Sequence, residues 1–211
     1  YKNASAAYES ARSFKGAYES QNIVAMRDEL KKFDEDLTSL QKSYNYLGWT
    51  RVVPLIGLYW KDGDAALKAG SHGVDTLEIV LQTIEPYSDI IGFTGDPNAQ
   101  SKSGEDTAED RIEFIVRTID DILPQLAVIS EKVNLAKSEI DNINPKRYPK
   151  IFLERKVRDK IEEGIFLVDE GARVVTEAKP FIEQAPYLLG LDSPKTYLVL
   201  FQNDKELRPT G

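Results

Sequence analysis

Residues 112–143 read IEFIVRTIDDILPQLAVISEKVNLAKSEIDNI and carry the clearest helical pattern of the chain. Apolar side chains recur in it three and four residues apart, and most positions between them carry charged or amide side chains. The apolar series is Ile112, Ile115, Ile119, Ile122, Leu126, Ile129, Val133, Ala136, Ile140 and Ile143. In an α-helix this spacing gathers the apolar side chains on one face. The stretch therefore predicts a long amphipathic helix, and Pro124 in its middle predicts a bend.

The same spacing recurs in three further stretches, at 23–47, 67–91 and 157–189. At 1.5 Å per residue such helices run roughly 40–55 Å. Four long helices joined by shorter segments bury their apolar stripes most simply in an up-down-up-down bundle. The predicted fold class is all-α: an elongated antiparallel bundle of four long helices plus a short N-terminal helix. In the fourth stretch Gly164 and Gly171 lie on the stripe, where tight helix packing is favoured over a ligand pocket.

The short N-terminal pattern covers residues 3–18, and its phase slips by one residue before Ile23. One interpretation is a helical hairpin in which Ser20 or Asn22 caps the second helix. The alternative is one continuous helix that carries a phase defect.

The connector at 48–63, GWTRVVPLIGLYWKDG, is too apolar for a free loop. Folded over the end of the bundle, it would close the core, and this is the favoured interpretation. Exposed, it would be an aromatic docking patch of the kind that interfaces prefer. Trp49, Tyr59 and Trp60 are therefore the candidate binding residues.

The pattern changes after Pro186. Residues 196–202, TYLVLFQ, are β-branched, aromatic and aliphatic, which predicts a strand. A single strand is not stable by itself. We therefore expect a helical bundle over residues 1–190 and the start of a second, truncated domain over residues 191–211.

Composition excludes several classes of function. The 211 residues carry a formal net charge of −8, which opposes binding to nucleic acid and to an anionic membrane surface. Cysteine is absent and there is a single histidine, so a thiolate nucleophile, a Cys-ligated zinc site and a di-iron site of Glu-x-x-His pairs are excluded. Most paired carboxylates lie off the apolar stripes, as on a solvated helix face. We expect no catalytic residue, metal or cofactor in this chain.

Residues 195–211, KTYLVLFQNDKELRPTG, resemble a bacterial family defined only as domain of unknown function 4012. The motif of that family reads approximately (R/K)TYLVLFQNNAELRPTGG. Asn203, Glu206 and Arg208 match it, with Leu207, Thr210 and Gly211, whereas Asp204 and Lys205 replace the usual Asn-Ala. Val53, Pro54 and Gly57 resemble a second, weaker element of the family.

The resemblance implies a protein with one transmembrane helix upstream of this chain, then a helical region, then a larger domain outside the cytoplasm. It assigns no activity, and the roles of Asn203, Glu206 and Arg208 stay open. The partners it suggests are other proteins or the C-terminal domain of the same protein.

Three hypotheses follow. The favoured one is a non-enzymatic extracytoplasmic spacer and interaction module of a membrane-anchored envelope protein. The second is a ligand-sensing four-helix bundle, with a pocket at Gly70, Gly164 and Gly171. The third is the N-terminal part of a polysaccharide-related envelope enzyme whose active site lies mainly beyond residue 211.

Overall fold

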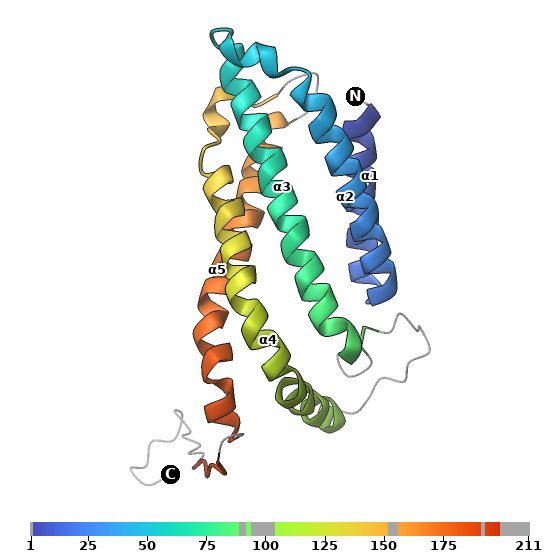
Figure 1. Ribbon diagram of the computed structural model, residues 1–211, viewed down its shortest axis with the longest axis vertical. Helices are drawn as coiled ribbons and strands as arrows, with labels where there is room; N and C mark the ends of the chain where they lie inside the picture. Colours follow the sequence, from blue (N-terminus) through green and yellow to red (C-terminus); the bar gives the residue numbers. More distant parts are fainter. Residues whose placement is uncertain (1, 89–91, 94–103, 152–155, 191–192, 199–211) are drawn as a thin grey trace, which may run out of the picture.

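The computed structural model describes residues 2–88, 92–93, 104–151, 156–190 and 193–198, with side chains omitted for 104–117 and 120. Within these residues the fold is all-α and contains no strand. The five α-helices are α1 (Lys2–Glu19), α2 (Ile23–Asn45), α3 (Ile56–Ile84), α4 (Gly104–Ile140) and α5 (Val157–Leu189). Short 3-10 helices lie at η1 (Gly48–Val52), η2 (Glu85–Tyr87) and η3 (Pro145–Arg147). Successive long helices run antiparallel, which confirms the predicted elongated bundle (Figure 1).

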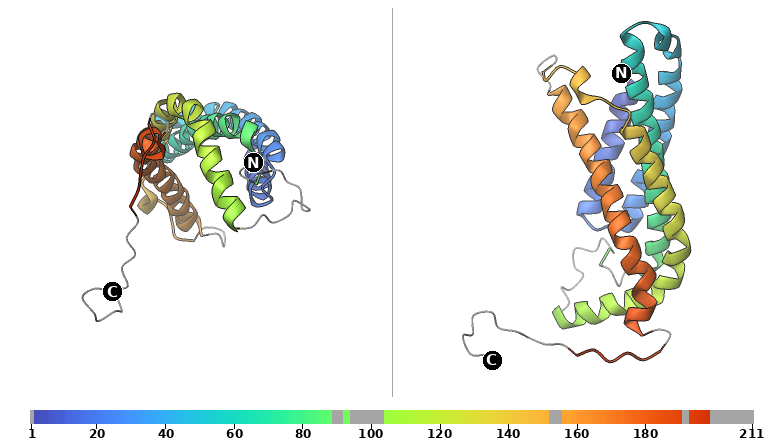
Figure 2. Two further views of the ribbon diagram at one scale, coloured as in Figure 1. Left: turned by 90° about the horizontal axis from the view of Figure 1, so that it is seen from below. Right: turned by 90° about the vertical axis from the view of Figure 1, so that its left-hand side faces the viewer.

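The helices are arranged in the order of the sequence. Each packs mainly against the helix before it and the helix after it, and α1 makes no substantial contact with α5. Viewed along the rods, the five helices form a curved layer rather than a closed ring (Figure 2). Consequently α1 and α5 are edge helices, and α5 has only α4 as a major helical neighbour.

The core lies on both sides of α3. Its residues Val74 and Leu81 join a buried cluster with α1 and α2 that includes Met26, Leu30 and Leu37. Toward the other side of the layer, its Ala69 packs with Ala136 and Ile140 of α4, and Ile165 and Val168 of α5 extend that second cluster. The heptad stripes of the sequence therefore form two cores that share one helix.

The N-terminal pattern is a helical hairpin. α1 ends at Glu19, and Asn22 caps α2, because its side-chain Oδ1 accepts a hydrogen bond of 3.0 Å from the backbone N–H of Ala25. The interpretation as one continuous helix is wrong. At the other end of the bundle, Gly190 ends α5 in the left-handed conformation, with φ of 73°.

Two boundaries differ from the sequence interpretation. The second half of the connector at 48–63 forms the first two turns of α3, which begins at Ile56. Of the predicted strand at 196–202, residues 196–198 adopt no strand, and the other four lie outside the described residues. A strand needs a partner for its backbone groups, and the described helices offer none.

α4 is a single helix of 37 residues that contains Pro124. Its N-terminal part turns away from the long axis of the layer, as Pro124 predicts (Figures 1 and 2). No helix in the described ranges combines the length and the apolar character that a bilayer crossing requires.

The cap at Asn22 gives a direct test of the hairpin. We expect Asn22→Ala to lower the free energy of unfolding by about 1 kcal/mol, because an N–H at the start of α2 loses its acceptor. Urea denaturation monitored by circular dichroism measures the change. Asn45→Ala, an exposed substitution at the end of the same helix, is the matched control. Equal effects of the two substitutions would contradict the role of the cap.

Candidate functional site

One end of the layer exposes an unusual amount of apolar surface. We call this end the tip and define it as residues 46–61 with residues 144–151. Figure 1 shows the connector at 48–55 as its outermost part. Exposed fractions reach 68% for Trp49, 78% for Val52 and 76% for Leu55. The favoured interpretation, a connector folded inward to close the core, is therefore wrong for these side chains.

Leu55, in the outermost connector of the tip, has a strained backbone conformation. Its φ of 68° and ψ of −48° lie outside the regions that leucine normally adopts. The N–H of Ile56 donates to the carbonyl of Pro54 at 2.9 Å, so Leu55 is the central residue of a strained γ-turn. A turn of this kind costs about 1–3 kcal/mol and marks a candidate functional position.

The tip is held on the bundle by close contacts below it. A Cβ at the buried Gly57 would lie 2.2 Å from the carbonyl oxygen of Arg51, so only glycine allows η1 to fold back on α3. Tyr44 stacks on Trp60 with ring centroids 5.8 Å apart, and its hydroxyl donates to the Trp60 carbonyl at 2.9 Å. The three candidate binding residues therefore differ in position. Trp60 packs on Tyr44 at the base of the tip, whereas the side chains of Trp49 and Tyr59 are exposed.

A buried ion pair joins the two connectors of the tip. The side chain of Asp62 is 2% exposed, and its Oδ1 accepts a hydrogen bond of 2.5 Å from Nη1 of Arg147. The hydroxyl of Tyr59 donates to the carbonyl of Arg147 at 3.0 Å, and the Tyr59 and Tyr148 rings meet edge to face at 5.1 Å. These contacts bind the start of α3 to η3, although 85 residues separate Asp62 from Arg147.

The aromatic hydroxyls beside this ion pair are perturbed. Burial raises the pKa of Tyr148, and the negative charge of Asp62 raises it further. Burial is also the main cause of the raised pKa of Tyr44, followed by the charges of Asp64 and Asp62. Both phenols are therefore held in their neutral form at the base of the tip.

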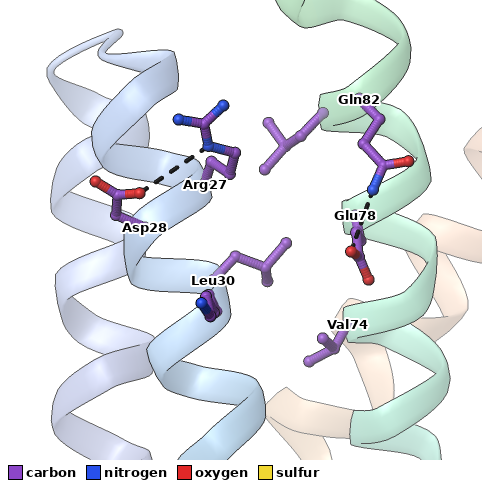
Figure 3. Close-up of a pocket in the computed structure, with 8 residues that line it drawn as sticks. Arg27, Asp28, Leu30, Val74, Glu78 and Gln82 are labelled. Atoms are coloured by element: carbon purple, nitrogen blue, oxygen red, sulfur yellow. Dashed lines mark hydrogen bonds and ion pairs between the residues drawn. The ribbon is translucent and has the colours of Figure 1, made fainter.

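A groove of about 370 Å³ lies between α2 and α3, away from the tip (Figure 3). Its walls are Leu30, Val74 and Leu81 with a charged rim that includes Arg27 and Glu78. Arg27 reaches out of it to Glu85 at 2.6 Å, and Glu78 accepts a hydrogen bond from Gln82. Arg27 and Glu78 therefore have polar partners within the protein.

The three glycines proposed to line a pocket do not come together. A Cβ at Gly70 would meet Leu37 Cδ2 at 3.3 Å, so that position is filled. A Cβ at Gly164 or Gly171 would meet no atom within 4 Å, and both glycines are exposed. The tight packing expected at Gly164 and Gly171 is therefore wrong.

The family-motif residues Asn203, Glu206 and Arg208 lie outside the described residues. Just before them, the Lys195 ammonium sits 3.7 Å from the centre of the Tyr187 ring, and the Tyr197 hydroxyl donates to the Leu188 carbonyl. The comparisons with known proteins add no assignment: no family model, no curated protein and no solved structure matches this chain. The resemblance of residues 195–211 stays a prediction.

The ion pair at the base of the tip can be tested by removing one partner. We expect Arg147→Met to destabilise the protein by about 3 kcal/mol, because the buried carboxylate of Asp62 loses the cation that pairs with it. Urea denaturation is the measurement, and Lys146→Met, which removes a neighbouring exposed cation, is the control. In the double variant Asp62→Leu with Arg147→Met, most of the loss should be recovered, and full additivity of the single losses would contradict the coupling.

The raised pKa of Tyr148 predicts an alkaline dependence of stability. The neutral phenol is favoured in the folded state, so this stabilisation is present below the unfolded pKa near 10 and is lost as pH rises through the folded pKa. In urea denaturation on both sides of pH 10, wild type should lose more stability than Tyr148→Phe. Tyr46→Phe removes an exposed hydroxyl and is the control. Identical losses in wild type and Tyr148→Phe would refute the assignment.

Proposed function

We propose that this chain is a non-enzymatic helical spacer and interaction module of a membrane-anchored bacterial envelope protein, located outside the cytoplasm. The compartment and the anchor rest on the resemblance of residues 195–211 to the family of unknown function. The interaction role rests on one structural observation, the uncovered apolar side of the edge helix α5.

α5 carries apolar residues over a wider arc than α4 covers. Ile165, Val168 and the buried Ala172 lie toward α4. Leu167, Val174, Phe181 and Leu188 recur every seven residues and are exposed, Phe181 to 73%. At 3.6 residues per turn a seven-residue spacing returns to nearly the same side of the helix. These four residues therefore form a line along α5 that no described helix covers.

A second line on α5 consists of small residues. Gly164, Gly171, Ala178 and Ala185 also recur every seven residues and lie between the exposed line and the face toward α4. Small side chains allow a neighbouring helix to approach closely, and the free space at Gly164 and Gly171 leaves room for it. A helix of a protein partner, or of the C-terminal domain of the same protein, fits this side best.

The alternative hypotheses have less support. A ligand-sensing bundle was suggested by a pocket at the glycines, and Gly70 is filled by Leu37 whereas Gly164 and Gly171 face open space. The enzyme hypothesis depends on Glu206 and Arg208, which lie outside the described residues.

Photo-crosslinking in cells tests the role of α5. A benzophenone amino acid placed at Val174 of the full-length protein should give adducts to a second protein or to the C-terminal domain, which mass spectrometry of the crosslinked peptides identifies. The same group at Asp34, an exposed position on α2, is the matched control. Equal adducts from both positions, or none from Val174, would refute the interaction role. Phe181→Glu should remove the adducts and change the free energy of unfolding by less than about 0.5 kcal/mol.

A further inference from the structure

The tip combines two features, exposed apolar side chains and exposed cations. The first is the exposed apolar group around Trp49, Val52 and Leu55 described above. Ile151 in the second connector adds to it, since its side chain is 66% exposed. The second feature is a set of cations without acidic partners.

Residues 46–61 and 144–151, which define the tip, contain no carboxylate. No Asp or Glu occurs between Leu37 and Lys61, a stretch that carries Lys42, Arg51 and Lys61. Residues 142–151 likewise contain cations and no acid. The remainder of the chain must therefore be more acidic than its net charge of −8 indicates. The fold brings these two segments together through the contacts of Arg147 with Tyr59 and Asp62.

Several cations on the sides of the rods are paired with carboxylates, whereas the exposed cations of the tip are not. Lys68, Lys132 and Lys137 lie within 2.7 Å of carboxylates on their own or neighbouring helices. At the tip, the exposed side chains without a carboxylate partner among the described residues are those of Arg51, Lys61, Lys146 and Lys150. These charges are available to an external anion.

We propose that the tip docks on the surface of a lipid bilayer that contains anionic lipid. Exposed Arg and Lys side chains attract anionic headgroups, each by about 1 kcal/mol near the surface, equivalent to about fivefold in partitioning. The apolar side chains of the tip enter the boundary between headgroups and acyl chains. Trp49 and Tyr46 are aromatic residues of the type that is enriched at this boundary.

The shape of the tip favours a bilayer over an acidic protein. The exposed apolar residues belong to the connector at the narrow end of the rods, whose backbone Figure 1 shows, whereas the central residues of a protein interface fit into packed pockets. A fluid boundary needs no complementary pocket. The strained turn at Leu55 fits the same role, because it holds an aliphatic side chain in solvent at the outermost connector.

This inference does not depend on the proposed function, because it rests on residues of the tip and not on the two lines of α5 residues. If the protein does not bind vesicles but the crosslinks from α5 still form, only the proposal of membrane docking by the tip is refuted. Conversely, Phe181→Glu should leave vesicle binding unchanged.

The test uses the fluorescence of Trp49 in the 211-residue chain. Titration with phosphatidylcholine vesicles that contain roughly 30 mol% phosphatidylglycerol should shift the tryptophan emission to shorter wavelength. The shift should be absent in Trp49→Phe, because the other tryptophan, Trp60, lies at the base of the tip. It should also be absent with pure phosphatidylcholine and strongly reduced in about 0.5 M NaCl, where charges are screened within several ångströms.

Charge variants provide the matched comparison. Arg51→Gln with Lys61→Gln should weaken partitioning about 25-fold, from about fivefold per cation. Arg12→Gln with Lys31→Gln removes two exposed cations from the sides of α1 and α2. This pair should change the partitioning onto anionic vesicles by less than about twofold. Leu55→Gly removes the strained side chain, so it should raise the urea midpoint yet weaken partitioning.

Three results with vesicles would overturn the proposal. They are an unshifted Trp49 emission with anionic vesicles, equal binding to neutral and anionic vesicles, and equal weakening by the two charge-variant pairs. Binding of the tip to soluble poly-glutamate but not to anionic vesicles would also overturn it, because the partner would then be an acidic protein.

Discussion

Burial of α3 on two sides is the constraint on which the rest of the structure depends. Val74 and Leu81 are covered from the α2 side, and Ala69 is covered from the α4 side. A helix with two buried faces sets the positions of both neighbours, and the remaining helices then extend the layer outward. Because the layer does not close, α1 and α5 each have a side that no described helix covers. The free side of α5 follows from this architecture and not from poor packing at one position.

The interactions that stabilise the tip differ from those that hold the helices together. Between the helices, apolar burial supplies the stabilisation, about 25 cal/mol per Å² removed from water. At the tip, the side chains of η1 point outward, so contacts of another kind must order the connectors. Asp62 and Arg147 join them by charge and by hydrogen bonding, and Gly57 lets η1 lie directly on α3. The same arrangement leaves Trp49 and Leu55 free of the core. Rigid support below and exposure above are what a surface-binding element requires.

Much of the fold could be predicted from the sequence, and much of the site could not. The stripe from Ile112 to Ile143 is decisive because helical periodicity is a local property of the chain. An apolar stripe does not show which neighbouring helix will cover it. The tight packing expected at Gly164 was therefore wrong. The pair of Asp62 and Arg147 spans 85 residues and has no local pattern. One signal was present: Asp62 is the first acid after a long acid-free apolar stretch, and a carboxylate buried among apolar residues needs a cation as its partner. The exposure of Trp49 was not predicted, because an apolar connector fits either a cap or a docking surface and the sequence favoured the cap.

Net charge is a poor guide to the partners of an elongated protein. A net charge of −8 opposes binding to an anionic surface only if every charge of the chain lies close enough to interact with that surface. In physiological salt, exposed charges are screened beyond about 8 Å, whereas the 29 residues of α3 extend roughly 44 Å at 1.5 Å per residue. A membrane in contact with the tip therefore responds to Arg51 and Lys61 and hardly to acids at the far end of the rods. The segregation of charge along the rods decides the interaction, and that segregation becomes visible only when the fold brings residues 46–61 and 144–151 together.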